Sequence, residues 1–268
     1  MPELPEVETI RRSLQTCEGQ RLNQISFHRL DIIRQKDFEP GYLEGQACTE
    51  LARRGKYLEF IFPENKYVTV HLGMSGRLWK STDPAEQQIK HVHMTAVLDS
   101  GETLIFYDPR RFGGIWLTYG PILSVQRLGI EPLSSAFQTE SWWEKAQKRK
   151  ASIKQVLLDQ RFIAGLGNIY ADESLFAAGI HPQREARSLT VQEWKILQQK
   201  IVEVLQASLS LKGTTFRDYR DGLNQKGAFQ NFLKVYGKSG TPCPHCGTNL
   251  EMVRIAQRSS CFCPVCQK

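Results

Sequence analysis

The first segment of the chain carries hydrophobic residues at helical spacing. They recur every three or four positions over residues 3–18, and Gly19 follows as a helix stop. The residues that form this apolar stripe are Val7, Ile10, Leu14 and Cys17. The spacing therefore predicts one amphipathic helix at the start of the chain.

From residue 20 to residue 120 the pattern changes, because hydrophobic and polar residues alternate with the period of a β-strand. Turn signals such as Asp99-Ser100-Gly101 separate the alternating segments. The predicted strands are 20–30, 48–62, 66–72, 91–99 and 103–107. Many short strands at this spacing are typical of an antiparallel sandwich or barrel.

After residue 130 the alternation stops and helical patterns follow. Residues 131–150 predict a linker that ends in a basic run, and helices are expected over 151–160 and 169–178. A longer helix starts at Thr190, where Thr190-Val-Gln-Glu is a capping-box pattern, and stops before Gly213. Strands followed by helices indicate an α+β chain with more than one domain.

The polar loop 213–230 follows the long helix. A loop of that length inside a compact protein is usually functional or disordered. Its three glycines, Gly213, Gly222 and Gly227, predict that it is mobile.

Five of the seven cysteines lie in the last 26 residues, and four of these form two pairs of the form Cys-x-x-Cys. They are Cys243, Cys246, Cys263 and Cys266. Two such knuckles can place four thiolates tetrahedrally around one zinc ion. Two disulfides are the alternative, which the absence of a secretory signal disfavours. Cys17, Cys48 and Cys261 are interpreted as ordinary residues, and His245 as an outer neighbour of the site or an exposed side chain.

Composition and charge limit the classes of function. The 268 residues are 41% hydrophobic, so the chain can bury a core, and it carries a formal net charge of +7. This charge favours a polyanionic partner such as nucleic acid. No apolar run approaches the roughly 18 residues of a membrane span, and no signal peptide is recognisable. A cytoplasmic protein is expected.

Four motifs stand out against this background. They are PELPEVE at 2–8, HLGMSG at 71–76, DPRRFG at 108–113 and GLGNIYADE at 165–173. Together with the cysteine module, they resemble the formamidopyrimidine-DNA glycosylase family, which also includes the endonuclease VIII branch. The resemblance extends from Pro2 to Lys268.

The resemblance implies an N-terminal β-sandwich with a flanking helix, a helix–two-turns–helix domain and a C-terminal zinc finger with one structural zinc ion. The expected boundaries are 1–130 for the catalytic domain, 131–150 for the linker, 151–235 for the helical domain and 236–268 for the zinc finger. It also implies a monomer that is associated with the nucleoid and binds duplex DNA containing oxidised bases.

Pro2 and Glu3 are the expected reaction centre. If Met1 is removed, Pro2 presents a free secondary amine, and an α-amino group titrates at about pH 8. By resemblance, this amine attacks the sugar C1′ of a damaged nucleotide, and Glu3 is the general acid that opens the sugar ring. The simpler interpretation is that Pro2 only starts the first helix.

Lys56 and Arg258 are expected to act on the phosphates. By resemblance, Lys56 contacts the phosphate next to the lesion and assists β-elimination, and Arg258 assists δ-elimination from the turn between the two zinc knuckles. The alternative for each is a solvated surface charge.

Met74, Arg110 and Phe112 match the residues that this family inserts into DNA. Extruding a nucleotide leaves a hole in the base stack, which an apolar wedge can fill. Met74 and Phe112 would form the wedge, and Arg110 would bind the orphaned base. Core burial of Met74 and Phe112 is the alternative.

Asn168, His91 and Arg149 match further DNA contacts of the family. Asn168 could instead be a simple N-cap, and His91 an ordinary strand residue. Lys154 could add charge to the same surface as Arg149.

The loop 213–230 matches the lesion-recognition loop of the purine-specific branch. Thr214, Thr215, Arg217 and Tyr219 are its candidate readers of an oxidised purine. The preferred function is removal of 8-oxoguanine and formamidopyrimidines, followed by β,δ-elimination. The pyrimidine-specific endonuclease VIII branch and a non-catalytic, zinc-dependent DNA-binding protein are the alternatives.

Overall fold

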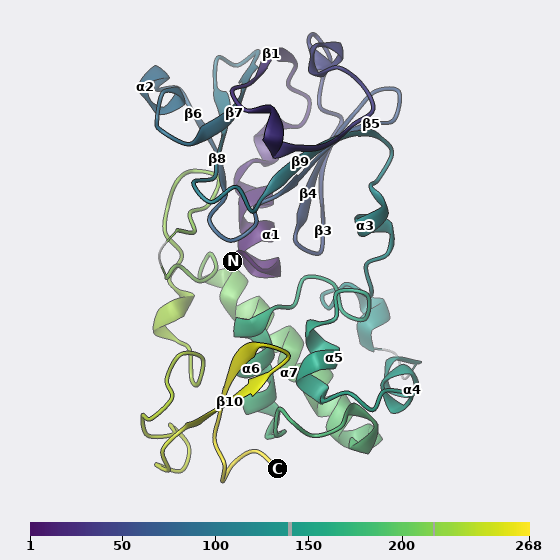
Figure 1. Cartoon of the computed structure of the whole chain (residues 1–268), viewed down its shortest axis with the longest axis vertical. Coiled ribbons are helices and arrows are strands. Elements are labelled where there is room, and N and C mark those ends of the chain that lie inside the picture. Colours follow the sequence, from purple (N-terminus) through teal and green to yellow (C-terminus); the bar gives the residue numbers. More distant parts are fainter. Residues whose placement is uncertain (139–140, 217) are drawn as a thin grey trace. The chain divides into compact units, whose positions relative to one another are not determined.

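The computed structural model describes residues 1–138, 141–216 and 218–268, and it divides into two compact units (Figure 1). The first unit comprises Met1–Arg127 and Leu209–Gln230, and the second comprises Leu128–Ser208 and Asn231–Lys268. The sequence places the loop 213–230 in the helical domain, whereas its contacts join it to the first unit.

Two sheets form the body of the first unit. One has the order β1-β7-β8-β6, and the other has the order β2-β9-β5-β4-β3. Adjacent strands are antiparallel except for the parallel pair β2 and β9. The strands are β1 Leu22–Phe27, β2 Ile33–Lys36, β3 Glu50–Arg54, β4 Tyr57–Phe62, β5 Lys66–His71, β6 Arg77–Ser81, β7 Val92–Leu98, β8 Thr103–Tyr107 and β9 Gly114–Tyr119.

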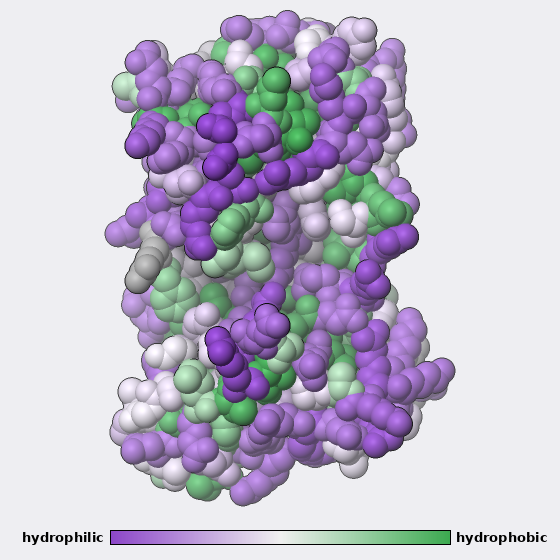
Figure 2. Space-filling model, in the orientation of Figure 1, coloured by the Kyte–Doolittle hydropathy of each residue, from purple (hydrophilic) through white to green (hydrophobic). Residues whose placement is uncertain are grey.

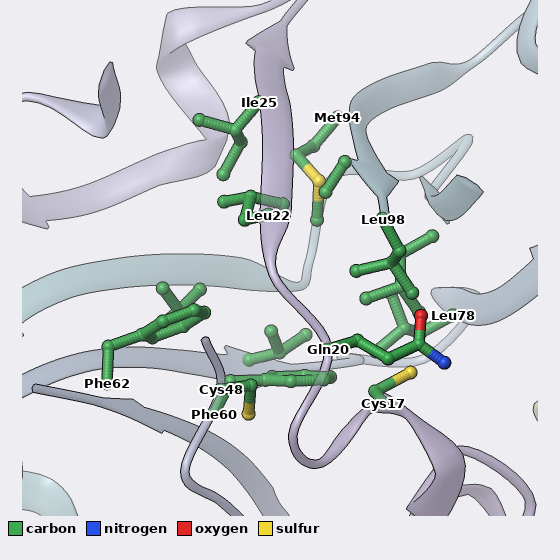
Figure 3. Close-up of a pocket in the computed structure, with 14 residues that line it drawn as sticks. Cys17, Gln20, Leu22, Ile25, Cys48, Phe60, Phe62, Leu78, Met94 and Leu98 are labelled. Carbon is green, nitrogen blue, oxygen red and sulfur yellow. The ribbon is translucent and has the colours of Figure 1, made fainter. Parts of the chain in front are cut away.

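The predicted α+β fold with an N-terminal sandwich is confirmed, and the core lies between the two sheets. Leu58 and Val70 of one sheet and Leu78 and Phe106 of the other belong to one buried cluster. Figure 3 shows a small cavity of about 30 Å³ in this core, into which Cys17 and Cys48 also face. Its lining is almost wholly apolar, so it offers few partners to a water molecule.

Three of the strands were not expected from the sequence. These are β2, β6 and β9, and the predicted strand 48–62 is in fact the hairpin of β3 and β4. The chain turns between them at Gly55, whose φ of 56° lies in the left-handed region that glycine tolerates. The segment Arg53-Arg54-Gly55-Lys56 interrupts the alternation at this turn, and this signal was not recognised.

Helix α1, Leu4–Ser13, confirms the predicted N-terminal helix but ends earlier, and a short 3-10 helix follows at Gln15–Cys17. Its stripe of Val7, Ile10 and Leu14 joins the sandwich core. The short helices α2, Pro84–Gln87, and α3, Leu123–Gln126, complete the helices of this unit, with 3-10 turns at Leu30–Ile32 and Pro40–Leu43.

Four helices and one hairpin make up the described part of the second unit. They are α4 Ser141–Gln147, α5 Ile153–Leu158, α6 Asn168–Ala178, α7 Val191–Ser210, β10 Glu251–Ile255 and β11 Arg258–Phe262, and the last two residues of α7 belong to the first unit. Further 3-10 turns lie at Ser135–Gln138, Ala186–Ser188 and Phe229–Asn231. Helix α4 lies inside the segment expected to be a linker.

The start of α7 confirms the predicted capping box. The Glu193 carboxylate accepts hydrogen bonds from the N–H and hydroxyl of Thr190, and the Glu193 N–H donates to the Thr190 hydroxyl. Among the described residues, no helix is both long and apolar enough to cross a membrane.

Candidate functional site

The N-terminal motif starts helix α1 and is buried. Pro2 and Glu3 are both buried, whereas Met1 is 42% exposed. The Glu6 carboxylate accepts a hydrogen bond from the Glu3 N–H at 2.8 Å, which fixes the backbone of the motif. Glu6 therefore holds the residue next to Pro2, and removal of the exposed Met1 would leave Pro2 as the first residue.

The same Glu6 side chain also holds the loop 213–230. Its second oxygen accepts a hydrogen bond from the Thr214 N–H at 2.7 Å, although 208 residues separate the two positions. Tyr219 is 6% exposed and donates from its hydroxyl to the Lys212 carbonyl at 3.1 Å. Burial raises the pKa of Tyr219 above its ordinary value. The loop is thus anchored to α1.

The glycines of this loop allow close packing, which differs from the mobility predicted for them. A Cβ on Gly222 would lie 2.7 Å from Ser13 Oγ, and a Cβ on Gly227 would lie 2.3 Å from the Gly213 carbonyl. The Gly222 N–H also donates to Ser13 Oγ at 2.9 Å. Thr214 and Thr215 are buried, so their side chains are not displayed. Arg217, a predicted reader of the lesion, lies outside the described residues.

Lys56 follows the turn at Gly55 and is only 6% exposed, so it is not an ordinary solvated lysine. Arg53 fixes this turn: its guanidinium donates to the Gly55 carbonyl at 3.0 Å and pairs with Glu8 of α1 at 3.0 Å. Burial and the neighbouring Lys56 charge lower the pKa of His71 to about 4. Lys56 therefore places its charge beside a neutral imidazole.

Met74, Arg110 and Phe112 lie on two turns, and core burial of the two apolar residues is wrong. Met74 is 43% exposed and Phe112 is 54% exposed. The guanidinium carbon of Arg110 lies 4.6 Å from the centre of the Phe112 ring. His91 lies next to the same turn, because its carbonyl accepts from the Asp108 N–H at 3.1 Å. It precedes β7 in the left-handed conformation, with φ of 75°.

Arg34 supports the Phe112 turn, and sequence reasoning missed it. Its guanidinium donates to the carbonyls of Arg111 at 2.9 Å and Gly113 at 2.6 Å. A Cβ on Gly114 would lie 2.5 Å from the Arg34 side chain. In the sequence, only Gly113 and Gly114 indicated close packing at this turn, and they did not identify Arg34 as the partner.

A groove in the second unit brings together Asn168 and Arg258. It measures about 670 Å³ and is also lined by Arg254, Met252 and Gln257. Arg254 and Arg258 are exposed on the strands that flank the β10–β11 turn. Two arginines and an amide at a helix start form a site suited to an anion. Sequence reasoning missed Arg254, which alternates with Val253 and Ile255 along an ordinary strand.

Asn168 is the first residue of α6, and the simple N-cap alternative is wrong because Gly167 occupies that position. Its side-chain nitrogen donates to the Ser259 carbonyl at 3.0 Å. Its side-chain oxygen has no hydrogen-bond partner within the part of the chain that the structure describes. Asn168 thus joins the start of α6 to the strand that carries Arg258.

Lys154 does not add charge to a surface, because it is fully buried. Its ammonium contacts Asp172 at 2.6 Å and donates to the Ser259 carbonyl at 3.1 Å. Asp172 also accepts from the Ser260 hydroxyl at 2.7 Å and the Cys261 N–H at 3.1 Å. Burial raises the pKa of Asp172, while the Lys154 charge and these hydrogen bonds oppose the shift. This network ties β11 to helices α5 and α6.

Arg149, a predicted DNA contact, has partners within its own unit. It pairs with Asp159 at 2.7 Å, and its guanidinium carbon lies 4.8 Å from the centre of the Phe162 ring. Its side chain remains 38% exposed.

The four predicted cysteines form the zinc site. Their sulfur atoms all lie within 4.8 Å of one another, with 3.9 Å between Cys243 and Cys266 and 3.5 Å between Cys246 and Cys263. Four thiolates at a Zn–S distance of about 2.3 Å would be about 3.8 Å apart. The set fits one structural zinc ion, with no ligand position left open. Cys261 faces the small core beside it instead.

Hydrophilic residues cover most of the molecular face shown in Figure 2. Hydrophobic side chains on that face form separate small groups rather than one broad patch. The exposed apolar residues that concern the site are therefore local features such as Met74, Phe112 and Met252.

Comparison with known proteins covers the whole chain. Residues 1–115 match the formamidopyrimidine-DNA glycosylase N-terminal domain, and residues 128–220 match the H2TH domain of the same family. Residues 240–268 match the zinc finger found in FPG and IleRS. The formamidopyrimidine-DNA glycosylase of Syntrophomonas wolfei is 46% identical over 268 residues, which is 100% of both chains.

Two solved structures are similar along the entire chain. One is a Lactococcus lactis FPG mutant in complex with a Fapy-dG containing DNA, at 37% identity and a TM-score of 0.91, with 100% of each chain covered. The other is MutM in complex with carbocyclic 8-oxo-G containing DNA, at 36% identity and a TM-score of 0.90, again with 100% of each chain covered.

Proposed function

The chain belongs to the formamidopyrimidine-DNA glycosylase family, and on this premise we propose that it removes oxidised purines from duplex DNA and then cleaves the abasic strand. The observation that carries the proposal is the Pro2-Glu3 pair, buried at the start of α1 behind an exposed Met1. A protein that only binds DNA has no need of a potential secondary amine at this position.

The first chemical step uses the Pro2 nitrogen as nucleophile. Once Met1 is removed, the nitrogen forms a bond to C1′ of the damaged nucleotide, and the C1′–base bond breaks with its electron pair leaving on the base. The nitrogen gives up its proton in this step, and the departing base takes up one proton. Glu3 donates a proton to the ring oxygen O4′, so the sugar opens and an iminium remains on C1′. The Glu6–Glu3 hydrogen bond supports this role by fixing the backbone that carries both groups.

Strand cleavage follows from the iminium, which acidifies C2′. Loss of the C2′ proton expels the 3′ phosphate in β-elimination, and a second proton loss expels the 5′ phosphate in δ-elimination. Water then hydrolyses the iminium, which releases the sugar fragment as an aldehyde and restores the Pro2 amine. Lys56 is assigned to the phosphate next to the lesion in the first elimination, and Arg258 to the phosphate that leaves in the second.

DNA binding is assigned to the two sets of exposed residues. Arg254, Arg258 and Asn168 line one groove, whose charge and amide donors suit a phosphate. Met74 and Phe112 would enter the base stack where the nucleotide is extruded, and Arg110 would bind the base left without a partner. The zinc ion, held by the four cysteines, stabilises the hairpin that carries Arg258 and takes no part in the chemistry.

The purine lesions are proposed because the similar solved structures are complexes with Fapy-dG and with carbocyclic 8-oxo-G DNA. The test uses duplexes that carry either 8-oxoguanine opposite cytosine or thymine glycol, with strand products separated by length and end group. We expect faster excision of 8-oxoguanine and a product with phosphate at both ends of the gap. Faster action on thymine glycol would contradict the purine assignment, and no cleavage of either duplex would contradict the enzyme.

Two variants divide the steps of this assay. Glu3→Gln should retain DNA binding and lose base excision, because it removes the proton donor and keeps the side-chain shape. Arg258→Ala should shift the products from δ-elimination toward β-elimination. Arg187→Ala is the matched control, because Arg187 is an exposed arginine of the same unit whose side chain pairs with nearby Glu185, and the substitution keeps its backbone contact.

A further inference from the structure

The turns that carry Met74 and Phe112 meet at one buried carboxylate, Asp108. This side chain is fully buried. One of its oxygens accepts from the Ser75 hydroxyl at 2.7 Å and from the Arg110 N–H at 3.3 Å. The other accepts from the Gly113 N–H at 2.8 Å. Each donor belongs to, or lies next to, one of the exposed residues Met74, Arg110 and Phe112.

The two turns also touch directly, and glycines allow this contact. A Cβ on Gly73 would lie 2.4 Å from the backbone of Phe112 and Gly113, and Gly73 has a φ of +59°. A Cβ on Gly113 would lie 2.6 Å from the His71 carbonyl. Backbone contact of this kind leaves little room for one turn to move without the other, provided that the hydrogen bonds between them are kept.

The backbone of Asp108 is fixed as well. Its carbonyl accepts from His93 Nε2 at 2.8 Å, and its N–H donates to the His91 carbonyl at 3.1 Å. Strands β7 and β8 therefore hold the carboxylate at the end of the sheet. Within the part of the chain that the structure describes, the hydrogen bond from the Ser75 hydroxyl, 33 residues earlier in the chain, joins Asp108 to the Met74 turn.

We propose that Asp108 is a positioning residue that joins the two turns and sets the spacing of Met74 relative to Arg110 and Phe112. The proposal rests on the proposed function, because the spacing matters only if these side chains enter DNA together. Asp108 is fully buried and would not touch the DNA. Without it, the buried Ser75 hydroxyl and Gly113 N–H lose their acceptor, and the turns can separate.

The shape of the carboxylate also predicts which substitution is tolerated. In Asp108→Asn the amide oxygen can still accept from the Gly113 N–H, and the amide nitrogen can donate to Ser75, because a hydroxyl also accepts. Only the longer contact, from the Arg110 N–H at 3.3 Å, loses its acceptor. In Asp108→Ala neither contact remains, and two buried donors lose their partner. Asn should therefore rescue the function that Ala loses.

The first test compares Asp108→Ala, Asp108→Asn and a control, Asp99→Ala. The control changes an exposed aspartate in the turn between β7 and β8. Single-turnover excision from an 8-oxoguanine duplex should fall about tenfold to a hundredfold in Asp108→Ala, as expected for misplaced binding groups. Asp108→Asn and Asp99→Ala should stay close to the unchanged protein. Cleavage of a preformed abasic site in single-stranded DNA should be retained in all three, because no base stack has to be entered.

Equal duplex rates for Asp108→Ala and Asp99→Ala would overturn the proposal. So would an equal loss on duplex and on single-stranded abasic DNA without rescue by Asn, because that result indicates general damage to the fold. If the unchanged protein cleaves neither DNA, the proposed function has failed instead.

A second measurement on the DNA-free protein does not depend on activity. Amide hydrogen exchange should become faster in residues 71–76 as well as in 108–113 when Asp108 is changed to Ala, and it should be nearly unchanged in Asp108→Asn. If residues 71–76 keep their exchange rates in Asp108→Ala, Asp108 does not join the two turns.

Discussion

Two buried aspartates, Asp108 in the first unit and Asp172 in the second, hold exposed site residues in place by different chemistry. Asp108 accepts hydrogen bonds from neutral donors, namely a hydroxyl and backbone N–H groups. Asp172 is paired with the buried ammonium of Lys154 and accepts two further hydrogen bonds. One carboxylate therefore joins two turns of the same sandwich, whereas the other attaches a hairpin to helices.

The difference follows from what surrounds each aspartate. The turns near Asp108 extend from large sheets whose strands already share a core. The β10–β11 hairpin has only two strands, and the cluster beside it contains few residues. A two-stranded hairpin is marginal by itself, so it depends on the zinc ion and on the ion pair. The stronger attachments, a zinc ion and a buried ion pair, therefore occur in the region whose local core is smaller.

Removal of zinc should have the largest effect, and it should be confined to the second unit. The metal supplies on the order of 10–16 kcal/mol of apparent binding free energy in small zinc modules. We expect Cys263→Ser to lose zinc and DNA binding, while the sandwich remains folded. Cys261→Ser is the matched control, because Cys261 is buried in β11, two residues before Cys263, and is not a ligand. Metal analysis measures the loss of zinc, and fluorescence anisotropy with a labelled duplex measures DNA binding. Hydrogen exchange of β4 and β5 shows whether the sandwich remains folded.

DNA binding that persists after verified zinc loss would contradict this dependence. So would unfolding of the sandwich together with the zinc finger, because the two regions would then not differ in what stabilises them.

Breaking the buried ion pair should have the next largest effect. Lys154→Met leaves the Asp172 charge without its cation, and removal of one partner of such a pair costs about 3–5 kcal/mol. The double variant Lys154→Met/Asp172→Leu should recover much of this loss, because no buried charge remains. Asp108→Asn should cost only about 1–2 kcal/mol, the scale of an altered hydrogen bond. Urea unfolding measures the free energy of unfolding of the three variants. An equal loss in Asp108→Asn and in Lys154→Met would remove the distinction between the two aspartates.

The last effect is a pH dependence in the first unit, and it is spread over more than two pH units. Burial and the Lys56 charge lower the pKa of His71 to about 4, whereas it is 6.5 in the reference state. The unfolded chain therefore binds the proton first as the pH falls. The contribution of His71 to the free energy of unfolding is complete above pH 6.5 and is lost as the pH falls toward 4. The slope of the free energy of unfolding is at most about 1.4 kcal/mol per pH unit. His71→Gln should reduce this slope between pH 6.5 and 4 and leave the slope above pH 7 unchanged.

An equal slope in the unchanged protein and in His71→Gln would show that His71 is not the titrating group. The free energy of unfolding at each pH can be taken from urea titrations.

Much of this architecture can be predicted from local sequence. Alternation located β7 and β8, the capping box located the start of α7, and the paired Cys-x-x-Cys spacing identified the zinc ligands. Each of these signals is complete within a short segment. Strand β2 was missed because it has only four residues, and β6 and β9 were not recognised from their alternation.

The supports of the site could not be predicted in this way. Lys154 was interpreted as a surface charge because its partner Asp172 lies in another helix and was not recognised. The loop 213–230 was expected to be mobile because the anchoring contact, from Thr214 to Glu6, spans nearly the whole chain. The exposed site residues belong to recognisable motifs, whereas the buried residues that hold them depend on tertiary contacts.

The most direct test of the account is to trap the reaction intermediate and identify the residue that carries it. The protein is incubated with a duplex containing one 8-oxoguanine opposite cytosine in the presence of borohydride, which reduces an iminium to a stable amine. The account predicts a covalent protein–DNA adduct at the Pro2 nitrogen, with Met1 absent from the adduct peptide. An adduct at a lysine, or an active protein that retains Met1, would contradict it.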